Sequence, residues 1–88
     1  MKIVVWTKIG CGWCVEVTDL LRSRGLPFEE RVVTGNRAYF DEMVEKSGQW
    51  LAPVVQIDDH LLIDTDADEV ESYLDSRAVS GVRGPSER

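Results

Sequence analysis

The sequence predicts an α/β fold in which one mixed, four-stranded sheet carries three helices. Three observations lead to this prediction: short runs of β-branched and aromatic residues, apolar residues at helical spacing between those runs, and glycine or proline at several junctions. The predicted order of elements is β-α-β-α-β-β-α. A strand–helix–strand unit requires a parallel crossover and a closing hairpin adds an antiparallel pair, so we expect the sheet to be mixed.

The first half of the chain predicts two strands and two helices. Residues 1–7 are expected to form a buried strand, because a run of β-branched and aromatic residues lies within them. Apolar residues recur at helical spacing across residues 13–24, and Gly25 ends that helix. A second strand is expected over residues 28–33. An asparagine then caps a helix over residues 36–47.

The second half predicts a hairpin and a last helix. A proline opens a strand at residues 54–57, and two aspartates turn the chain into a strand at residues 61–63. Asp66 is expected to cap the final helix, because a glutamate follows it three residues later. The apolar periodicity does not continue into residues 78–88. We therefore expect residues 1–77 to form one domain, followed by a flexible tail.

The charge balance excludes some partners. Lysines and arginines number 10 and aspartates and glutamates 16, which gives a formal net charge of −6. Nucleic acid and anionic membrane surfaces both require clustered positive charge, so neither is an expected partner. The apolar run at residues 3–6 is too short for a signal peptide or a membrane span. We expect a cytoplasmic monomer whose fold begins at its first residues.

The two cysteines, Cys11 and Cys14, follow the first predicted strand and open the first predicted helix. Structural disulfides are rare in a reducing compartment, so reactivity explains the pair better than stability does. At a helix N-terminus, unpaired backbone N–H groups and the positive end of the helix dipole stabilise a thiolate on Cys11. Lys8 adds a positive charge nearby. Cys14 lies one helical turn further on, so its sulfur can reach that of Cys11.

This spacing predicts thiol–disulfide exchange, and Cys-x-x-Cys between a strand and a helix is a redox signature. Cys11 attacks a disulfide to form a mixed disulfide, and Cys14 then attacks Cys11 and releases the reduced substrate. Two alternatives are weaker. A zinc site would need further ligands, for which only His60 and carboxylates are available, so we expect no metal. An inert core pair is the other alternative, but glycines at positions 10 and 12 favour an exposed loop.

Two motifs carry a resemblance to a known family. The run Lys8-x-x-Cys11-Gly12-Trp13-Cys14, with Ala52-Pro53-Val54-Val55 further along the chain, resembles the glutaredoxin family, and the similarity extends from Lys2 to about Leu74. The resemblance implies a thioredoxin-like fold and a glutathione-linked dithiol–disulfide oxidoreductase that serves cell redox homeostasis. It also implies protein disulfides or glutathione mixed disulfides as substrates, glutathione as the electron donor, and no tightly bound cofactor.

The resemblance implies a role for each residue that matches the family motifs. Cys11 matches the nucleophile and Cys14 the resolving cysteine. Six further residues match the glutathione-binding groove: Lys8, Trp13, Ala52, Pro53, Thr65 and Asp66. The indole of Trp13 stands where the family usually has a tyrosine or phenylalanine that forms one wall of that groove.

Different residues of the groove are expected to contact different parts of glutathione. Lys8 matches the residue that helps to bind the glycyl carboxylate and to lower the thiol pKa. The backbone of Ala52 is expected to pair with the glutathione cysteine. Thr65 and Asp66 match the residues that hold the γ-glutamyl end, although Asp66 alone reads equally as a helix cap. Pro53 matches a proline that is held cis, whereas the residues alone also allow a trans proline opening a strand.

Departures from the family pattern leave alternatives open. Ile63-Asp64 stands where the family usually has Gly-Gly, so Asp64 brings a negative charge near the expected γ-glutamyl carboxylate, and Leu51 replaces the usual threonine. These changes fit a redoxin recycled by thioredoxin reductase or by another low-molecular-weight thiol, as in mycoredoxins. Gly12 replaces the usual proline, which leaves a [2Fe–2S] carrier, a glutathione-bridged dimer, as a further alternative. Trp50, if exposed, could grip a protein partner.

Overall fold

The computed structural model describes residues 1–82, with side chains for residues 1–77. Its elements follow the predicted order, and the predicted fold class is confirmed. They are β1 (Ile3–Thr7), α1 (Gly12–Ser23), β2 (Glu29–Val32), α2 (Arg37–Ser47), β3 (Val54–Ile57), β4 (His60–Leu62) and α3 (Ala67–Val82). Most boundaries lie within one or two residues of the prediction, which is the usual precision of element ends.

The four strands form one mixed sheet in the order β2-β1-β3-β4. β1 runs parallel to β2 and antiparallel to β3, and β3 runs antiparallel to β4. Trp6 pairs with Val54 and Val55 pairs with Leu62. This register brings the ends of β1, β2 and β4 and the start of β3 to one end of the sheet.

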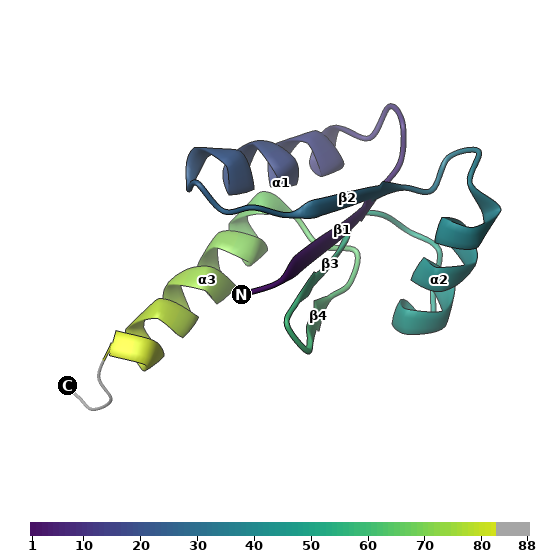
Figure 1. The fold of residues 1–88 in the computed structure, drawn as a ribbon. Coiled ribbons are helices and arrows are strands. Elements are labelled where there is room, and N and C mark those ends of the chain that lie inside the picture. The colour runs from purple at the N-terminus through teal and green to yellow at the C-terminus, as the bar shows by residue number, and fades with distance from the viewer. Residues whose placement is uncertain (83–88) are drawn as a thin grey trace.

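We call this end of the sheet the loop end. Helices α1, α2 and α3 all begin there, each directly after a connecting segment (Figure 1). The segments that meet at the loop end are residues 8–11, 33–36, 48–53 and 63–66. Residues on the parts of these segments next to the strand ends therefore lie at the same end of the sheet as the two cysteines.

Helices cover both faces of the sheet, and every residue of β1 is buried as a result. On one face α1 and α3 contact each other (Figure 1). The apolar stripes of these two helices are buried at their centres, while Leu20, Ala67 and Tyr73 are half-buried. The buried cluster on this face is Ile3, Val5, Val17, Leu21, Val55, Ile57, Leu62, Val70 and Leu74. The cluster on the α2 face is Val4, Trp6, Val33, Met43 and Val54.

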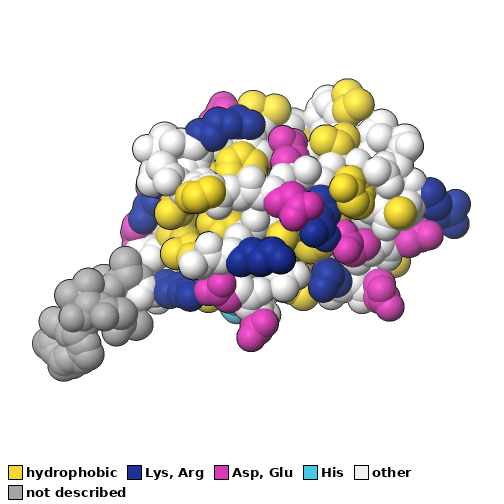
Figure 2. Space-filling view, viewed as in Figure 1, with side chains coloured by type: hydrophobic (Ala, Val, Ile, Leu, Met, Phe, Trp, Pro, Cys, Tyr) yellow, Lys and Arg dark blue, Asp and Glu magenta, His cyan; other side chains and the backbone are white. Residues whose placement is uncertain are grey.

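The face drawn in Figure 2 has no segregated patch of positive charge among its described residues that would suit a polyanion. On the face drawn in Figure 2, Lys and Arg side chains are interspersed with Asp and Glu. Several of these charges form ion pairs, such as Arg24 with Asp75 at 3.0 Å and Arg37 with Asp41 at 2.9 Å. None of the helices in the described range is long and apolar enough to cross a membrane.

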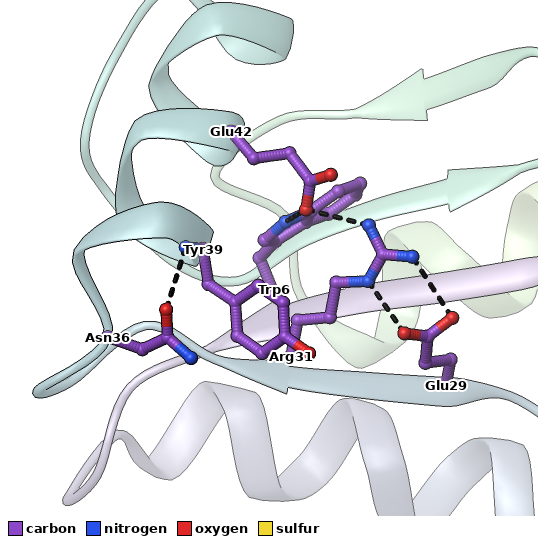
Figure 3. Close-up of polar contacts among 6 residues, drawn as sticks. All are labelled: Trp6, Glu29, Arg31, Asn36, Tyr39 and Glu42. Atoms are coloured by element: carbon purple, nitrogen blue, oxygen red, sulfur yellow. Dashed lines mark hydrogen bonds and ion pairs between the residues drawn. The ribbon is translucent and has the colours of Figure 1, made fainter.

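A polar network fastens α2 and β2 to β1 (Figure 3). Trp6 is fully buried, and its indole N–H donates a 2.9 Å hydrogen bond to Oε1 of Glu42. Arg31 donates to the same oxygen at 2.7 Å and to Glu29 at 2.8 Å. Burial opposes ionisation of Glu42, but the hydrogen bonds from Arg31 and Trp6 outweigh it and lower the pKa of that carboxyl.

Side chains cap the N-termini of α2 and α3, as the sequence predicts. The Asn36 side chain accepts a 3.0 Å hydrogen bond from the amide of Tyr39, and α2 ends at Gly48 in a left-handed conformation. Asp66 accepts a 2.8 Å hydrogen bond from the amide of Glu69 and so caps α3. These caps satisfy N–H groups that a helix leaves unpaired.

The final helix differs from the prediction at its far end. We expected it to stop near Arg77, whereas α3 runs to Val82, so residues 78–82 of the predicted flexible tail are helical. Apolar periodicity underestimated its length, because residues 78–80 are compatible with a helix although the apolar repeat in the sequence does not continue into them. Residues 83–88, the rest of the predicted tail, lie outside the described part of the chain.

Candidate active site

The two cysteines lie where β1 passes into α1. Cys11 is the N-cap residue of α1 and Cys14 lies in its first turn. They form a disulfide with Cα atoms 5.2 Å apart. Gly10 has a φ of +80°, a conformation that glycine adopts without steric cost and that turns the chain from the strand into the helix.

The two sulfurs have different surroundings. The backbone N–H of Cys14 donates a 3.2 Å hydrogen bond to Sγ of Cys11, which takes the place of an N-cap oxygen. Cys11 is half-buried and Cys14 is buried. The first turn of α1 contains no acidic residue that would oppose a negative charge on Cys11. After reduction, this arrangement favours a thiolate on the more accessible Cys11.

Hydrogen bonds join the segments of the loop end to one another. The amide of Ile9 donates to the hydroxyl of Thr34 at 3.0 Å. The ammonium of Lys8 donates to the carbonyl of Trp50 at 2.8 Å. The amide of Thr65 donates to the carbonyl of Pro53 at 3.0 Å. These hydrogen bonds connect the segment before Cys11 to the β2–α2 and α2–β3 connections. They also connect the residue before β3 to the segment before α3.

The structure brings all eight residues singled out from the sequence to the loop end. The peptide bond between Ala52 and Pro53 is cis, as the resemblance implied. Pro53 and Thr65 are buried, Ala52 is half-buried, and Trp13 is exposed. Lys8, which we expected beside the reactive thiol, has its hydrogen bond to the Trp50 carbonyl.

Ile63 and Asp64 stand where the family usually has Gly-Gly, and Asp64 has a backbone conformation that glycine favours. Asp64 has a φ of +50°, in the left-handed region that glycine favours, and its side chain is exposed. Ile63 is also exposed. The backbone thus keeps a turn that suits glycine while presenting a carboxylate and an apolar side chain at the loop end.

Two polar residues of the loop end, Thr34 and Gln49, make contacts that the sequence does not indicate. The role of Thr34 has no local signal in the sequence, because its contact with Ile9 is tertiary. Gln49 shapes the next segment: its side-chain oxygen accepts from the amide of Leu51 at 2.6 Å and its amide nitrogen donates to the carbonyl of Leu51 at 3.0 Å. In the described part of the chain, no group of three or more His, Cys, Asp or Glu side chains could hold a metal ion.

A family model described as Glutaredoxin matches residues 3–62. The chain belongs to the glutaredoxin family. It is 36% identical over 57 residues to glutaredoxin 3 of Escherichia coli K12, a match that covers 65% of this chain and 69% of that protein. This glutaredoxin is therefore a thiol–disulfide oxidoreductase, and its paired cysteines provide the groups that such chemistry requires.

Two further proteins are similar to this chain, one in sequence and one in fold. The chain is 39% identical over 57 residues to N-acetyl-S-hydroxy-L-cysteine reductase of Bacillus subtilis, covering 65% of this glutaredoxin and 61% of that enzyme. The crystal structure of a glutaredoxin from Archaeoglobus fulgidus matches with a TM-score of 0.72 at 16% identity, over 82% of this chain and 84% of that one. The second likeness concerns the fold alone.

Proposed function

We propose that this glutaredoxin reduces protein disulfides and glutathione mixed disulfides, with Cys11 as nucleophile, Cys14 as resolving thiol and glutathione as electron donor. The observation that carries the proposal is the asymmetry of the pair. The more accessible sulfur, that of Cys11, accepts the amide N–H of Cys14 at the start of α1, while Cys14 itself is buried. A nucleophile needs access and a stabilised thiolate, whereas a resolving thiol needs only proximity.

The electron balance of the proposed cycle is simple. The Cys11 thiolate attacks one sulfur of the substrate disulfide; a bond from Cys11 to that sulfur forms, and the other substrate sulfur leaves as a thiolate that takes up a proton. Cys14 then attacks Cys11, which releases the second substrate thiol and leaves the Cys11–Cys14 disulfide. Two molecules of glutathione return two electrons to that disulfide and leave as glutathione disulfide.

The proposed glutathione groove comprises Lys8, Trp13, Ala52, Pro53, Thr65 and Asp66. Support comes from their common placement at the loop end beside the cysteines. The exposed indole of Trp13, one position before Cys14, offers an apolar wall. The ammonium of Lys8 would have to share its contact with the Trp50 carbonyl in order to bind the glycyl carboxylate.

One observation favours an electron donor other than glutathione. Asp64 presents an exposed carboxylate at the loop end, next to the residues proposed for the γ-glutamyl end. A negative charge there repels the γ-glutamyl carboxylate. Thioredoxin reductase or another low-molecular-weight thiol is therefore the alternative donor. The Bacillus subtilis relative is named for a small cysteine derivative, which agrees with low-molecular-weight sulfur compounds as reactants.

The chemistry also bears on where the protein works. A cycle that starts from reduced Cys11 and draws electrons from thiols requires a compartment that keeps thiols reduced. We propose that this compartment is the cytoplasm.

The donor is identified by measuring how fast the Cys11–Cys14 disulfide is reduced. One reaction contains glutathione, glutathione reductase and NADPH, and a parallel one contains thioredoxin reductase and NADPH. Fast reduction in the first supports glutathione as donor, and reduction in the second alone supports the alternative. Asp64→Asn is expected to speed the glutathione reaction by about fivefold, because exposed charges a few ångströms apart interact by about 1 kcal/mol. Asp59→Asn, at the opposite end of the sheet, is the matched control.

A further inference from the structure

Most of the large apolar side chains that are exposed in the described residues lie at the end of the sheet that carries the reactive cysteines. Of seven large hydrophobic side chains that are exposed in the described residues, four lie on the loop-end segments and a fifth lies between the two cysteines in the sequence. They are between 43% and 76% exposed: Ile9, Trp13, Trp50, Leu51 and Ile63. The other two are Met1 and Val15. Figure 2 shows hydrophobic side chains at the upper right, over the loop between β1 and α1.

The fold does not require these side chains. They lie outside both buried clusters, so their removal would leave the core intact. Scattered apolar residues are normal on a surface, but five at one end of the sheet, from three connecting segments and the first turn of α1, suit an interaction site. Two of them are tryptophans, the residue type most often found among the energetic anchors of protein interfaces.

The same end of the molecule carries unpaired negative charge. Four exposed carboxylates stand at the start of α3: Asp64, Asp66, Asp68 and Glu69. Among the described residues, none of the four takes part in an ion pair. The basic side chains described at this end have partners of their own: the ammonium of Lys8 is bonded to the Trp50 carbonyl, and Arg37 at the start of α2 is paired with Asp41. A ligand that is apolar and basic therefore complements this surface.

We propose that this apolar rim, made of Ile9, Trp13, Trp50, Leu51 and Ile63, docks a segment of a disulfide-bearing protein. The segment carries apolar side chains on both sides of its cysteine and a lysine or arginine that faces the carboxylates at the start of α3. This inference rests on the proposed function of Cys11 and deepens it by naming the substrate class.

The dimensions of the surface favour a polypeptide over a small thiol. The rim extends across the ends of three neighbouring strands, because Ile9 follows β1, Trp50 and Leu51 precede β3, and Ile63 follows β4. A ligand that contacts both ends of this array must have side chains on either side of its reacting sulfur. A protein segment meets that condition, and its apolar side chains would be removed from water against the indoles.

The test uses peptides that each contain one cysteine, activated as a mixed disulfide with thionitrobenzoate. One peptide has leucine and phenylalanine beside the cysteine and a lysine further on, a second replaces the apolar residues with serine, and a third replaces the lysine with glutamate. Pre-reduced protein is mixed with each peptide, and the second-order rate of thionitrobenzoate release is recorded. Hydroxyethyl disulfide, which is small and uncharged, serves as the reference substrate.

The apolar, basic peptide is expected to react about tenfold faster than the serine peptide, the size of effect that one interface anchor gives. It should also react several-fold faster than the glutamate peptide. Trp50→Ser and Ile63→Ser should each reduce the ratio of its rate to that of hydroxyethyl disulfide, and Trp50→Phe should keep most of it. Asp64→Asn should narrow the gap between the lysine and glutamate peptides, while Asp59→Asn leaves it unchanged.

Two results would overturn the inference in different ways. Equal rates for the three peptides, with normal reduction of hydroxyethyl disulfide, would refute the docking surface and leave the proposed function intact. Failure to reduce any of the substrates would refute the proposed function itself.

Discussion

The backbone N–H of Cys14 points at the Sγ atom of Cys11 from 3.2 Å. This contact places one cysteine in the role of a helix cap and the other in the body of the helix. The helix therefore acts on the two sulfurs unequally, since the partial positive charge at its start is felt most strongly by Cys11. The accessible sulfur is also the one that the backbone prepares to carry a negative charge.

The first prediction concerns the acidity of Cys11. In a Cys14→Ser variant, the rate of alkylation of Cys11 by iodoacetamide should rise with pH through a pKa below the ordinary value of about 8.5, because the helix start stabilises the thiolate. The measurement is the alkylation rate across the pH range, followed by mass spectrometry. A midpoint at or above the ordinary value would show that the capping contact does not activate the thiol.

A second prediction tests the segment that precedes Cys11. Thr34→Val removes the hydroxyl that accepts the amide of Ile9, and it should lower the free energy of unfolding by about 1 kcal/mol and slow the reaction of Cys11. Thr34→Ser keeps the hydroxyl and should behave as the wild type. Urea unfolding and the alkylation rate of Cys11 provide the two readouts. If Thr34→Val matched Thr34→Ser in both, the loop contact would have no function.

A third prediction concerns stability in acid. The pKa of Glu42 is lowered from 4.5 in the folded protein because its hydrogen bonds with Arg31 and Trp6 outweigh burial, so the unfolded chain binds the proton more readily. The contribution of Glu42 is therefore fully present above pH 4.5 and is lost as the pH falls through the lowered pKa. Glu42→Gln should reduce stability near neutrality and flatten the loss in acid. The measurement is the free energy of unfolding by urea at several pH values. Parallel dependences on pH for the wild type and Glu42→Gln would contradict the prediction.

A fourth prediction separates two roles of Asp66. Asp66→Ala removes the cap of α3 and should cost about 1 kcal/mol of unfolding free energy, whereas Asp66→Ser keeps an oxygen for the amide of Glu69 and should cost little. Both variants remove the charge, so both should change the Michaelis constant for glutathione if Asp66 binds its γ-glutamyl end. Steady-state kinetics and thermal unfolding distinguish the roles, and an unchanged Michaelis constant in both variants would leave Asp66 with the cap alone.

Local signals in the sequence were sufficient for most of the fold. Asn36 and Asp66 were predicted as caps because a cap is formed within a few residues of chain, and Trp6 was predicted as core because it lies in an apolar run. The extent of α3 beyond Arg77 was missed because that part of the helix adds no apolar stripe. Periodicity detects buried faces rather than helices as such.

The candidate site was less open to prediction than the fold. The motif located Cys11 and Cys14, since their chemistry depends on spacing along one helix. The contact between Lys8 and the Trp50 carbonyl joins segments that are distant in sequence, and only the packing of the sheet creates it. The apolar rim also depends on the packing of the sheet. Ile9 and Ile63 are distant in sequence, and only the pairing of the strands brings both to the loop end.

The central claim is that Cys11 attacks and Cys14 resolves, and trapping of the mixed disulfide tests it most directly. The wild type, Cys11→Ser and Cys14→Ser are each reduced, mixed with a disulfide-containing peptide and analysed by intact-protein mass spectrometry. The account predicts a stable peptide adduct on Cys14→Ser, located at Cys11, with no turnover in Cys11→Ser. Turnover by Cys11→Ser, or an adduct that forms on Cys14 in preference to Cys11, would contradict it.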